Sequence, residues 1–212
     1  MTGKIIVAER VTLITGASAG IGTELVRVFA ANGHRVAMVA RRADRLQSLA
    51  AELDRNEQLA MIAVNIRALT DLSLRFSDQL IRNRGGLLNV ASIASFLPGP
   101  GMAVYYASKA YVLSFTEALR GELGPKGVRV TALCPGPVPS EFQTRAGFEP
   151  GFDSAVLNVS APDVAEAAYR GLMADKRVVL PGLGIKIVPF MLRLVPRGFI
   201  LSAVTRLQTR QL

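Results

Sequence analysis

The chain of 212 residues contains one cysteine, one histidine and no tryptophan, and these shortages exclude several kinds of site. Because Cys134 has no second cysteine to pair with, the chain cannot form an internal disulfide, which suits a reducing compartment. No cluster at metal-ligand spacing accompanies His34, so we expect no metal site. Aromatic residues make up 6% of the chain and the basic residues form no run, so we expect no nucleic-acid partner.

The sequence also lacks a long uncharged apolar run. A membrane-spanning helix needs about 18 or more such residues, and the best candidate, residues 185–204, is interrupted by charged residues and prolines. The residues after Met1 do not form the apolar segment of a signal peptide. We therefore expect a cytoplasmic protein without a spanning helix.

Hydrophobic residues, in contrast, make up 50% of the chain and charged residues 19%, which predicts a folded domain with a sizeable core. The formal net charge is +9, and the basic residues are scattered along the chain. Such a surface attracts an anionic cofactor or an anionic membrane, or is simply solvated. The charge alone does not choose among these.

Short apolar runs rich in β-branched residues alternate with amphipathic stretches at the start of the chain. Residues 11–15 and 36–40 are typical of buried strands, and residues 21–31 and 43–53 of helices. Residues 56–82 are helical in pattern, with no convincing strand among them. The β-α-β-α order predicts a parallel sheet covered by helices.

The second part of the chain continues this alternation. Residues 86–91, 128–133 and 177–181 predict three further strands, and residues 105–123 and 163–174 predict two helices. The predicted fold class is therefore α/β, with a doubly wound, Rossmann-like parallel sheet of about five strands.

A glycine-rich segment, Thr15-Gly-Ala-Ser-Ala-Gly-Ile-Gly22, follows the first predicted strand and opens the first helix. Its glycines allow a tight turn, and a helix N-terminus offers free N–H groups and a partial positive charge to a pyrophosphate. We therefore predict a dinucleotide-phosphate site, with a glycine-rich turn that binds no ligand as the alternative. The predicted contacts are Gly16, Ser18, Ala19, Gly20, Ile21 and Gly22.

Tyr105 and Lys109 form a Tyr-x-x-x-Lys pair in the predicted helix 105–123. Positions four apart share one helix face, so the phenol and the ammonium can act together. A nearby ammonium lowers the pKa of a tyrosine from its ordinary value of about 10, so Tyr105 could donate or accept a proton at the substrate. Tyr106 lies about 100° further around the helix and cannot take the same role. The alternative is that Tyr105 is an exposed helix tyrosine.

The glycine-rich segment and the Tyr-x-x-x-Lys pair resemble those of the short-chain dehydrogenase/reductase family. The resemblance implies an oxidoreductase that transfers hydride between a nicotinamide cofactor and a carbonyl or alcohol substrate, with Tyr105 as acid/base and Lys109 lowering its pKa. Ser92, at the end of the strand before the tyrosine, would polarise the substrate carbonyl. Asn65, in a Val-Asn pattern, would hold a water that relays protons from Lys109. Taken singly, Ser92 also fits a strand-end cap and Asn65 a solvated helix residue.

The resemblance also implies that the cofactor contacts two further segments of the chain. The second predicted strand ends in Ala40-Arg41-Arg42, where an acidic residue would hold the ribose hydroxyls of NAD. Arg41 and Arg42 can instead pair with a 2′-phosphate, which favours NADP(H) over NAD(H), unless they only cap the next helix or face water. The other implied cofactor contacts are Tyr105, Lys109, Pro135, Gly136, Val138 and Ser140.

The chain departs from the family between its second and third predicted strands. About two β-α units of the family, one of them carrying a central strand, have no counterpart there. If the two halves of the sheet pair directly, Ser92 and Tyr105 move by about 4.8 Å towards the glycine-rich segment, and a shift of about 1 Å can cost about a hundredfold in rate. The alternative function is therefore a catalytically impaired family member that serves as a cofactor-binding or interaction module.

We assign residues 1–182 to one Rossmann-like catalytic domain and residues 183–212 to an apolar, basic helical extension that divides at residues 196–198. The extension either packs on the domain or on a partner subunit, which we favour, or makes peripheral contact with a membrane surface. Phenylalanine and leucine side chains in residues 141–160 predict a small apolar carbonyl or alcohol substrate. The family resemblance implies a homodimer or homotetramer.

Overall fold

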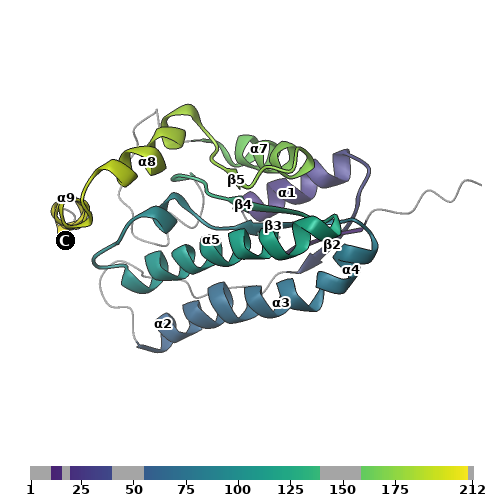
Figure 1. Ribbon diagram of the computed structural model, residues 1–212, viewed down its shortest axis with the longest axis horizontal. Helices are drawn as coiled ribbons and strands as arrows, with labels where there is room; N and C mark the ends of the chain where they lie inside the picture. The colour runs from purple at the N-terminus through teal and green to yellow at the C-terminus, as the bar shows by residue number, and fades with distance from the viewer. Residues whose placement is uncertain (1–10, 16–19, 40–54, 139–158, 210–212) are drawn as a thin grey trace, which may run out of the picture.

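The computed structural model describes residues 11–15, 20–39, 55–138 and 159–209. Figure 1 shows parallel strands between two layers of helices. The predicted helix at residues 43–53 lies outside the described residues.

The N-terminal unit consists of β1 (Val11–Thr15), α1 (Gly20–Ala31) and β2 (Arg35–Val39). The two strands pair in parallel along their full lengths. α1 buries Leu25 and Phe29, which are four residues apart and therefore share one face. Gly33 follows α1 with a φ of +77°, a conformation that favours glycine, and turns the chain into β2. The predicted strand-helix-strand order is confirmed.

A helical segment follows, made of α2 (Arg55–Ile62), the π-helical turn η1 (Ala63–Ala68), α3 (Leu69–Arg75) and α4 (Ser77–Arg82). This agrees with the helical pattern predicted for residues 56–82, and residues 55–82 contain no strand. The π-helical turn was not predicted, because one additional residue per turn leaves no clear mark on the apolar spacing.

The C-terminal unit consists of β3 (Gly86–Val90), η2 (Ile93–Phe96), α5 (Ala103–Leu123), η3 (Gly124–Lys126), β4 (Arg129–Leu133), α7 (Ala161–Met173) and β5 (Val178–Val179). β4 lies between β3 and β5 and pairs in parallel with both. α5 and α7 both pack against β4, and Val130, Ala132 and Leu133 are completely buried. Such double coverage explains the continuous apolar run of this strand.

Five parallel strands are described, and they confirm the predicted α/β fold class. They form two hydrogen-bonded groups, β1-β2 and β3-β4-β5, and β1 and β3 do not pair within the described residues. The direct pairing of the two halves, with the shift of Ser92 and Tyr105 that it would cause, is therefore not observed. Because residues 55–82 supply only helix, they provide no strand to bridge the two groups.

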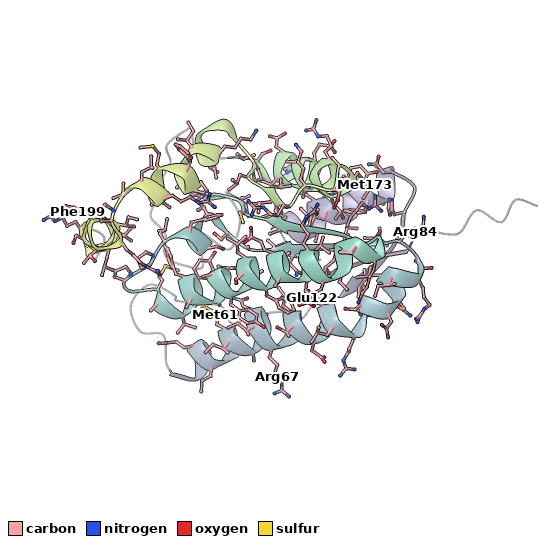
Figure 2. The ribbon with its side chains drawn as sticks, viewed as in Figure 1. Met61, Arg67, Arg84, Glu122, Met173 and Phe199 are labelled. Atoms are coloured by element: carbon pink, nitrogen blue, oxygen red, sulfur yellow. The ribbon has the colours of Figure 1, made fainter. Side chains whose placement is uncertain are left out.

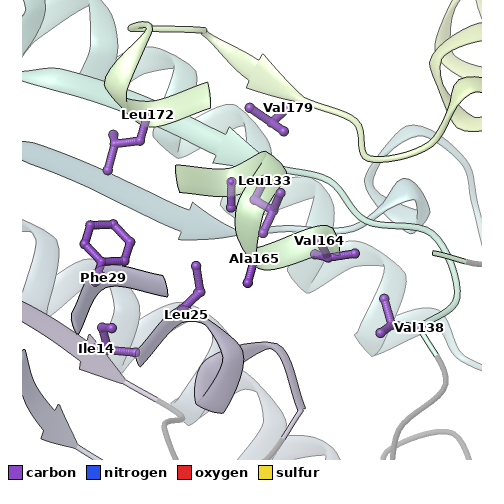
Figure 3. Packing of buried hydrophobic residues seen from close by; sticks show 10 residues of the cluster. Ile14, Leu25, Phe29, Leu133, Val138, Val164, Ala165, Leu172 and Val179 are labelled. Atoms are coloured by element: carbon purple, nitrogen blue, oxygen red, sulfur yellow. The ribbon is translucent and has the colours of Figure 1, made fainter. Parts of the chain in front are cut away.

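Side chains join the two strand groups instead (Figure 3). Ile14 of β1 and Leu25 of α1 share one buried cluster with Leu133 of β4 and Val164 of α7. α1 and α7 lie side by side over this cluster. Burial of apolar surface is the dominant favourable term in folding, so this cluster holds the end of β1 close to the end of β4 without a backbone ladder.

The C-terminal extension forms two helices, α8 (Leu183–Leu194) and α9 (Arg197–Thr209), at one end of the molecule (Figure 1). The predicted division of the extension into two helices is confirmed, but the break falls at Val195 and Pro196 rather than at residues 196–198, and Arg197 and Gly198 belong to α9. No helix within the described ranges combines the length and the apolar character needed to cross a membrane.

Candidate active site

Tyr105 and Lys109 lie in the first two turns of α5, on one face of the helix. The Lys109 Nζ atom is 5.9 Å from the centre of the Tyr105 ring. Further along α5, Val112 and Leu119 are buried in the core, and this packing fixes the helix. The structure therefore places the predicted pair together on a rigid element.

Lys109 is anchored at the carboxyl end of β3. Its Nζ atom donates a hydrogen bond of 3.1 Å to the Val90 carbonyl, the last residue of the strand. Burial lowers the pKa of Lys109 to about 8, because a desolvated ammonium is disfavoured relative to the neutral amine. The charge of Lys109 therefore changes close to neutral pH.

Ser92 is buried two residues beyond β3 and forms the N-cap of η2. Its Oγ accepts a hydrogen bond of 3.1 Å from the Ala94 amide, and its own amide donates one of 3.3 Å to Ser95 Oγ. Ser95 Oγ in turn donates a hydrogen bond of 2.7 Å to the Lys109 carbonyl. Ser95 thus connects the Ser92 turn to α5. Ser95 was not predicted, because the sequence signal of a capping box is Glu or Gln three residues after the N-cap, not Ser.

Tyr105 faces Ser92 across this turn. Burial raises the pKa of Tyr105 above its ordinary value, a side-chain hydrogen bond with Ser92 lowers it, and Tyr106 raises it, with burial the largest effect. This direction is opposite to the one predicted from the Tyr-x-x-x-Lys spacing. The reason is that spacing reports the neighbouring ammonium but not the loss of water around the phenol, which disfavours the phenolate.

Tyr106 packs beside Tyr105 at the start of α5. Its ring meets the Tyr105 ring edge to face, with centroids 5.8 Å apart and planes at 81°. It also packs closely against Gly99, where any side chain would overlap the Tyr106 ring. Tyr106 therefore belongs to the packing around the site.

Asn65 lies in the π-helical turn η1 and reaches α5 through Ser108. Its Nδ2 atom donates a hydrogen bond of 3.0 Å to Ser108 Oγ, and Ser108 Oγ donates one of 2.8 Å to the Tyr105 carbonyl. Ser108 is buried and was not singled out in the sequence, because a serine between Tyr105 and Lys109 looks like an ordinary helix residue. The structure thus connects Asn65 to the backbone of the Tyr105 turn.

The N-terminus of α1 includes Gly20, Ile21 and Gly22, three of the predicted phosphate contacts. Gly20 has a φ of +55°, in the region that favours glycine. The first N–H groups of a helix have no partner within it and carry a partial positive charge. Gly16, Ser18, Ala19, Arg41, Arg42 and Ser140 lie outside the described residues.

The loop after β4 contacts both the Ser92 turn and the buried cluster at the end of β1. The Pro135 carbonyl accepts a hydrogen bond of 2.9 Å from the Ile93 amide, next to Ser92. Val138 is buried in the same cluster as Ile14 and Leu25 (Figure 3). The residues from Pro135 through Gly136 to Val138 therefore connect the Ser92 turn to the start of α1, although β1 and β3 do not pair.

The hydrogen-bond donors at the N-terminus of α1 and on Lys109 suit the phosphates of a dinucleotide. α1 offers backbone N–H groups to a pyrophosphate, and Lys109 offers the N–H groups that remain beside its bond to Val90. Within the described ranges, no group of three or more His, Cys, Asp or Glu side chains could hold a metal ion. The chemistry of these residues fits a dinucleotide cofactor.

Cys134 and His34 contribute to packing. Cys134 is fully buried, and burial raises the pKa of its thiol to about 12, so it is protonated at neutral pH. His34 Nδ1 is hydrogen-bonded to Thr12 Oγ1 at 2.8 Å, and its ring meets the edge of Phe29.

Known proteins resemble this chain in sequence and in fold. The family described as short chain dehydrogenase matches residues 10–61 and 54–149. Serine 3-dehydrogenase from Agrobacterium fabrum is 29% identical over 74% of this chain and 85% of that protein. Sulfoacetaldehyde reductase 2 from Chromohalobacter salexigens is 30% identical over 75% of this chain and 86% of that protein. A solved short-chain dehydrogenase from Sphingobium yanoikuyae, in complex with NADPH, has a TM-score of 0.72 and 25% identity, over 90% of this chain and 94% of that one.

The alignments also show an internal gap. The match to serine 3-dehydrogenase runs over 212 positions but takes up only 74% of this chain's 212 residues, so about a quarter of those positions have no counterpart here. The family match falls into two stretches that overlap at residues 54–61. Both findings agree with a segment missing between β2 and β3.

Proposed function

The chain belongs to the short-chain dehydrogenase family, whose members are NAD(P)-dependent oxidoreductases, and we propose that it transfers hydride between NADP(H) and the carbonyl or alcohol group of a small apolar substrate. The observation that supports this most directly is the arrangement of Ser92, Tyr105 and Lys109 at the carboxyl end of β3. When bound, the cofactor supplies or accepts the hydride.

Tyr105 is the proposed proton donor in carbonyl reduction. Because burial raises its pKa, the phenol carries its proton at neutral pH and is ready to protonate the oxygen of the carbonyl. The Ser92 hydroxyl would polarise that carbonyl by a hydrogen bond. Lys109 would place a positive charge beside the cofactor, and Asn65 would position the Tyr105 turn through Ser108.

The preference for NADP(H) rests on Arg41 and Arg42. Two cationic side chains after the second strand complement a 2′-phosphate and replace the acidic residue that would hold the ribose hydroxyls of NAD. The NADPH in the related Sphingobium yanoikuyae structure is consistent with this choice.

A second candidate function is a cofactor-binding or interaction module without turnover. The absence of pairing between β1 and β3 in the described residues favours it. The glycine-rich segment and the Ser92 turn come from different strand groups, and hydride transfer requires their positions to be accurate to about 1 Å.

NADPH titration followed by turnover assays on a panel of apolar aldehydes and ketones separates the two candidates. We expect NADPH binding and turnover, with Tyr105→Phe lowering kcat at least about a hundredfold while NADPH still binds. Tyr106→Phe is the matched control and should keep kcat. NADPH binding without turnover would establish the second candidate, and full activity of Tyr105→Phe would refute the assigned proton donor.

We also propose a homodimer or homotetramer. Exposed apolar side chains on the helical segment of residues 55–75 would be covered by a partner subunit, namely Leu59, Ile62, Val64 and Leu74. The mass of the purified protein in solution, measured by light scattering, tests this, and a monomer would contradict it.

A further inference from the structure

α8 packs against the body of the protein through one side only. Ile185 is 1% exposed, and α8 packs against η2. Leu192 of α8 and Ile200 of α9 line a cavity of about 700 Å³ whose other wall includes Phe96 and Tyr106. The predicted packing of the extension on the domain is therefore present, and it fixes which side of α8 faces outward.

The outward side of α8 carries a stripe of large apolar residues. Ile187, Phe190, Met191 and Leu194 have the spacing i, i+3, i+4 and i+7, which places them on one helix face. Each is between 51% and 66% exposed. Phe199 at the start of α9 is 71% exposed and points away from the body at the same end of the molecule (Figure 2). A contiguous exposed patch of this kind marks a binding surface.

Cations flank this apolar stripe. Lys186 and Arg193 are seven residues apart and lie along the same side of α8, next to the stripe, and Arg197 follows at the start of α9. All three are exposed, and none forms an ion pair within the described part of the chain. Residues 183–212 contain no Asp or Glu. The surface is therefore apolar at its centre and cationic at its edge.

We propose that α8 lies flat on an anionic membrane surface, with Ile187, Phe190, Met191 and Leu194 inserted at the level of the headgroups and Lys186 and Arg193 in contact with lipid phosphates. An apolar helix face bordered by cations is the arrangement that binds such surfaces. A second copy docked through the same stripe would bring two sets of cations together, with no acidic residue in 183–212 to offset them. The charge pattern therefore favours lipid over self-association.

Co-sedimentation of the full chain with vesicles tests the proposal. We expect binding to phosphatidylcholine vesicles that contain phosphatidylglycerol, weak binding to phosphatidylcholine alone, and release at high salt. The double variant Phe190→Ser/Leu194→Ser should lower the partition coefficient at least about tenfold, because each side chain loses its apolar burial. Lys186→Gln/Arg193→Gln should lower binding to the anionic vesicles about tenfold or more, since each cation near the surface contributes about fivefold.

Two control variants match these changes on another surface. Phe76→Ser removes an exposed apolar side chain between α3 and α4, outside the proposed subunit contact, and Arg67→Gln/Arg82→Gln removes two exposed cations. Arg67 points away from the body on the side opposite α8 (Figure 2). Both controls should bind vesicles like the original chain, and thermal unfolding should show that all variants are folded. No binding to the anionic vesicles, or unchanged binding of Phe190→Ser/Leu194→Ser, would overturn the proposal. A dimer that this variant converts to a monomer, without lipid binding, would assign the stripe to self-association and would also overturn it.

Discussion

The Lys109 ammonium donates a hydrogen bond of 3.1 Å to the Val90 carbonyl and lies 5.9 Å from the centre of the Tyr105 ring. The bond fixes the ammonium at the end of β3, and burial gives it a pKa of about 8. The neighbouring Tyr105 and Cys134 have pKa values raised by burial, so Lys109 is the first of the three to lose its proton as the pH rises above neutral.

The affinity for NADPH should therefore fall as the pH rises through about 8. Below this pH Lys109 is charged and can donate charge-assisted hydrogen bonds to the cofactor, whereas the neutral amine binds more weakly. We expect the Kd to rise about tenfold between pH 7 and pH 9, measured by NADPH fluorescence. Lys109→Met should bind weakly with no such pH dependence. A Kd of the original chain that stays flat across this range would contradict the role of Lys109.

Lys109 should also lower the stability of the fold near neutral pH. Its pKa in the folded state, about 8, lies below its ordinary value of 10.5, so the unfolded chain binds more protons between these pH values. Stability should consequently rise with pH across that window, and the full penalty applies below about pH 8. Lys109→Met should raise the free energy of unfolding at pH 7 by about 1–2 kcal/mol, even after the bond to Val90 is lost.

Chemical denaturation at pH 7 and pH 10 measures this effect. The exposed Lys176→Met is the control and should change stability little at either pH. A less stable Lys109→Met protein at pH 7 would show that the hydrogen bond to Val90 outweighs the cost of burying the ammonium.

The order of strands and helices was predictable because each element carries its own period of apolar residues. β1, α1 and β2 required only local patterns, and Tyr105 and Lys109 only a spacing of four. Whether β1 and β3 pair depends on the meeting of segments far apart in the sequence, which the local period of apolar residues does not report. The direction of the Tyr105 pKa shift likewise depends on burial by residues that are remote in sequence.

The supporting residues of the site were harder to predict than the reactive ones. Ser95 and Ser108 act through single hydrogen bonds to the backbone of α5, and small hydroxyl residues occur at many positions without such a role. The two sides of α8 were also ambiguous, because Ile185 and Ile187 look alike in sequence and only the packing of the helix separates the buried from the exposed residue.

Ser95 should act as a positioning residue. Its hydroxyl accepts a hydrogen bond from the Ser92 amide and donates one to the Lys109 carbonyl, so Ser95→Ala releases the Ser92 turn from α5. We expect kcat to fall about tenfold with little change in the KM for NADPH, because a small displacement of Ser92 affects the reacting carbonyl most. Ser77→Ala removes a similar hydrogen bond on α4 and should leave kcat unchanged. A loss of stability equal in both variants, with kcat preserved in Ser95→Ala, would count against the positioning role.

Two helical glycines should respond to alanine in opposite directions. Gly171 of α7 faces Val179 of β5 so closely that an added Cβ would overlap the valine side chain, which is stiff because it is β-branched. Gly171→Ala should therefore destabilise the protein by about 1–3 kcal/mol, since α7 must move away from β5. An added Cβ at Gly121 of α5 meets no atom within 4 Å, so Gly121→Ala should stabilise it by about 0.5–1 kcal/mol through the smaller entropy of the unfolded chain. Urea denaturation of the two variants measures both changes, and a Gly171→Ala protein as stable as Gly121→Ala would show that α7 does not pack on β5 as closely as the structure has it.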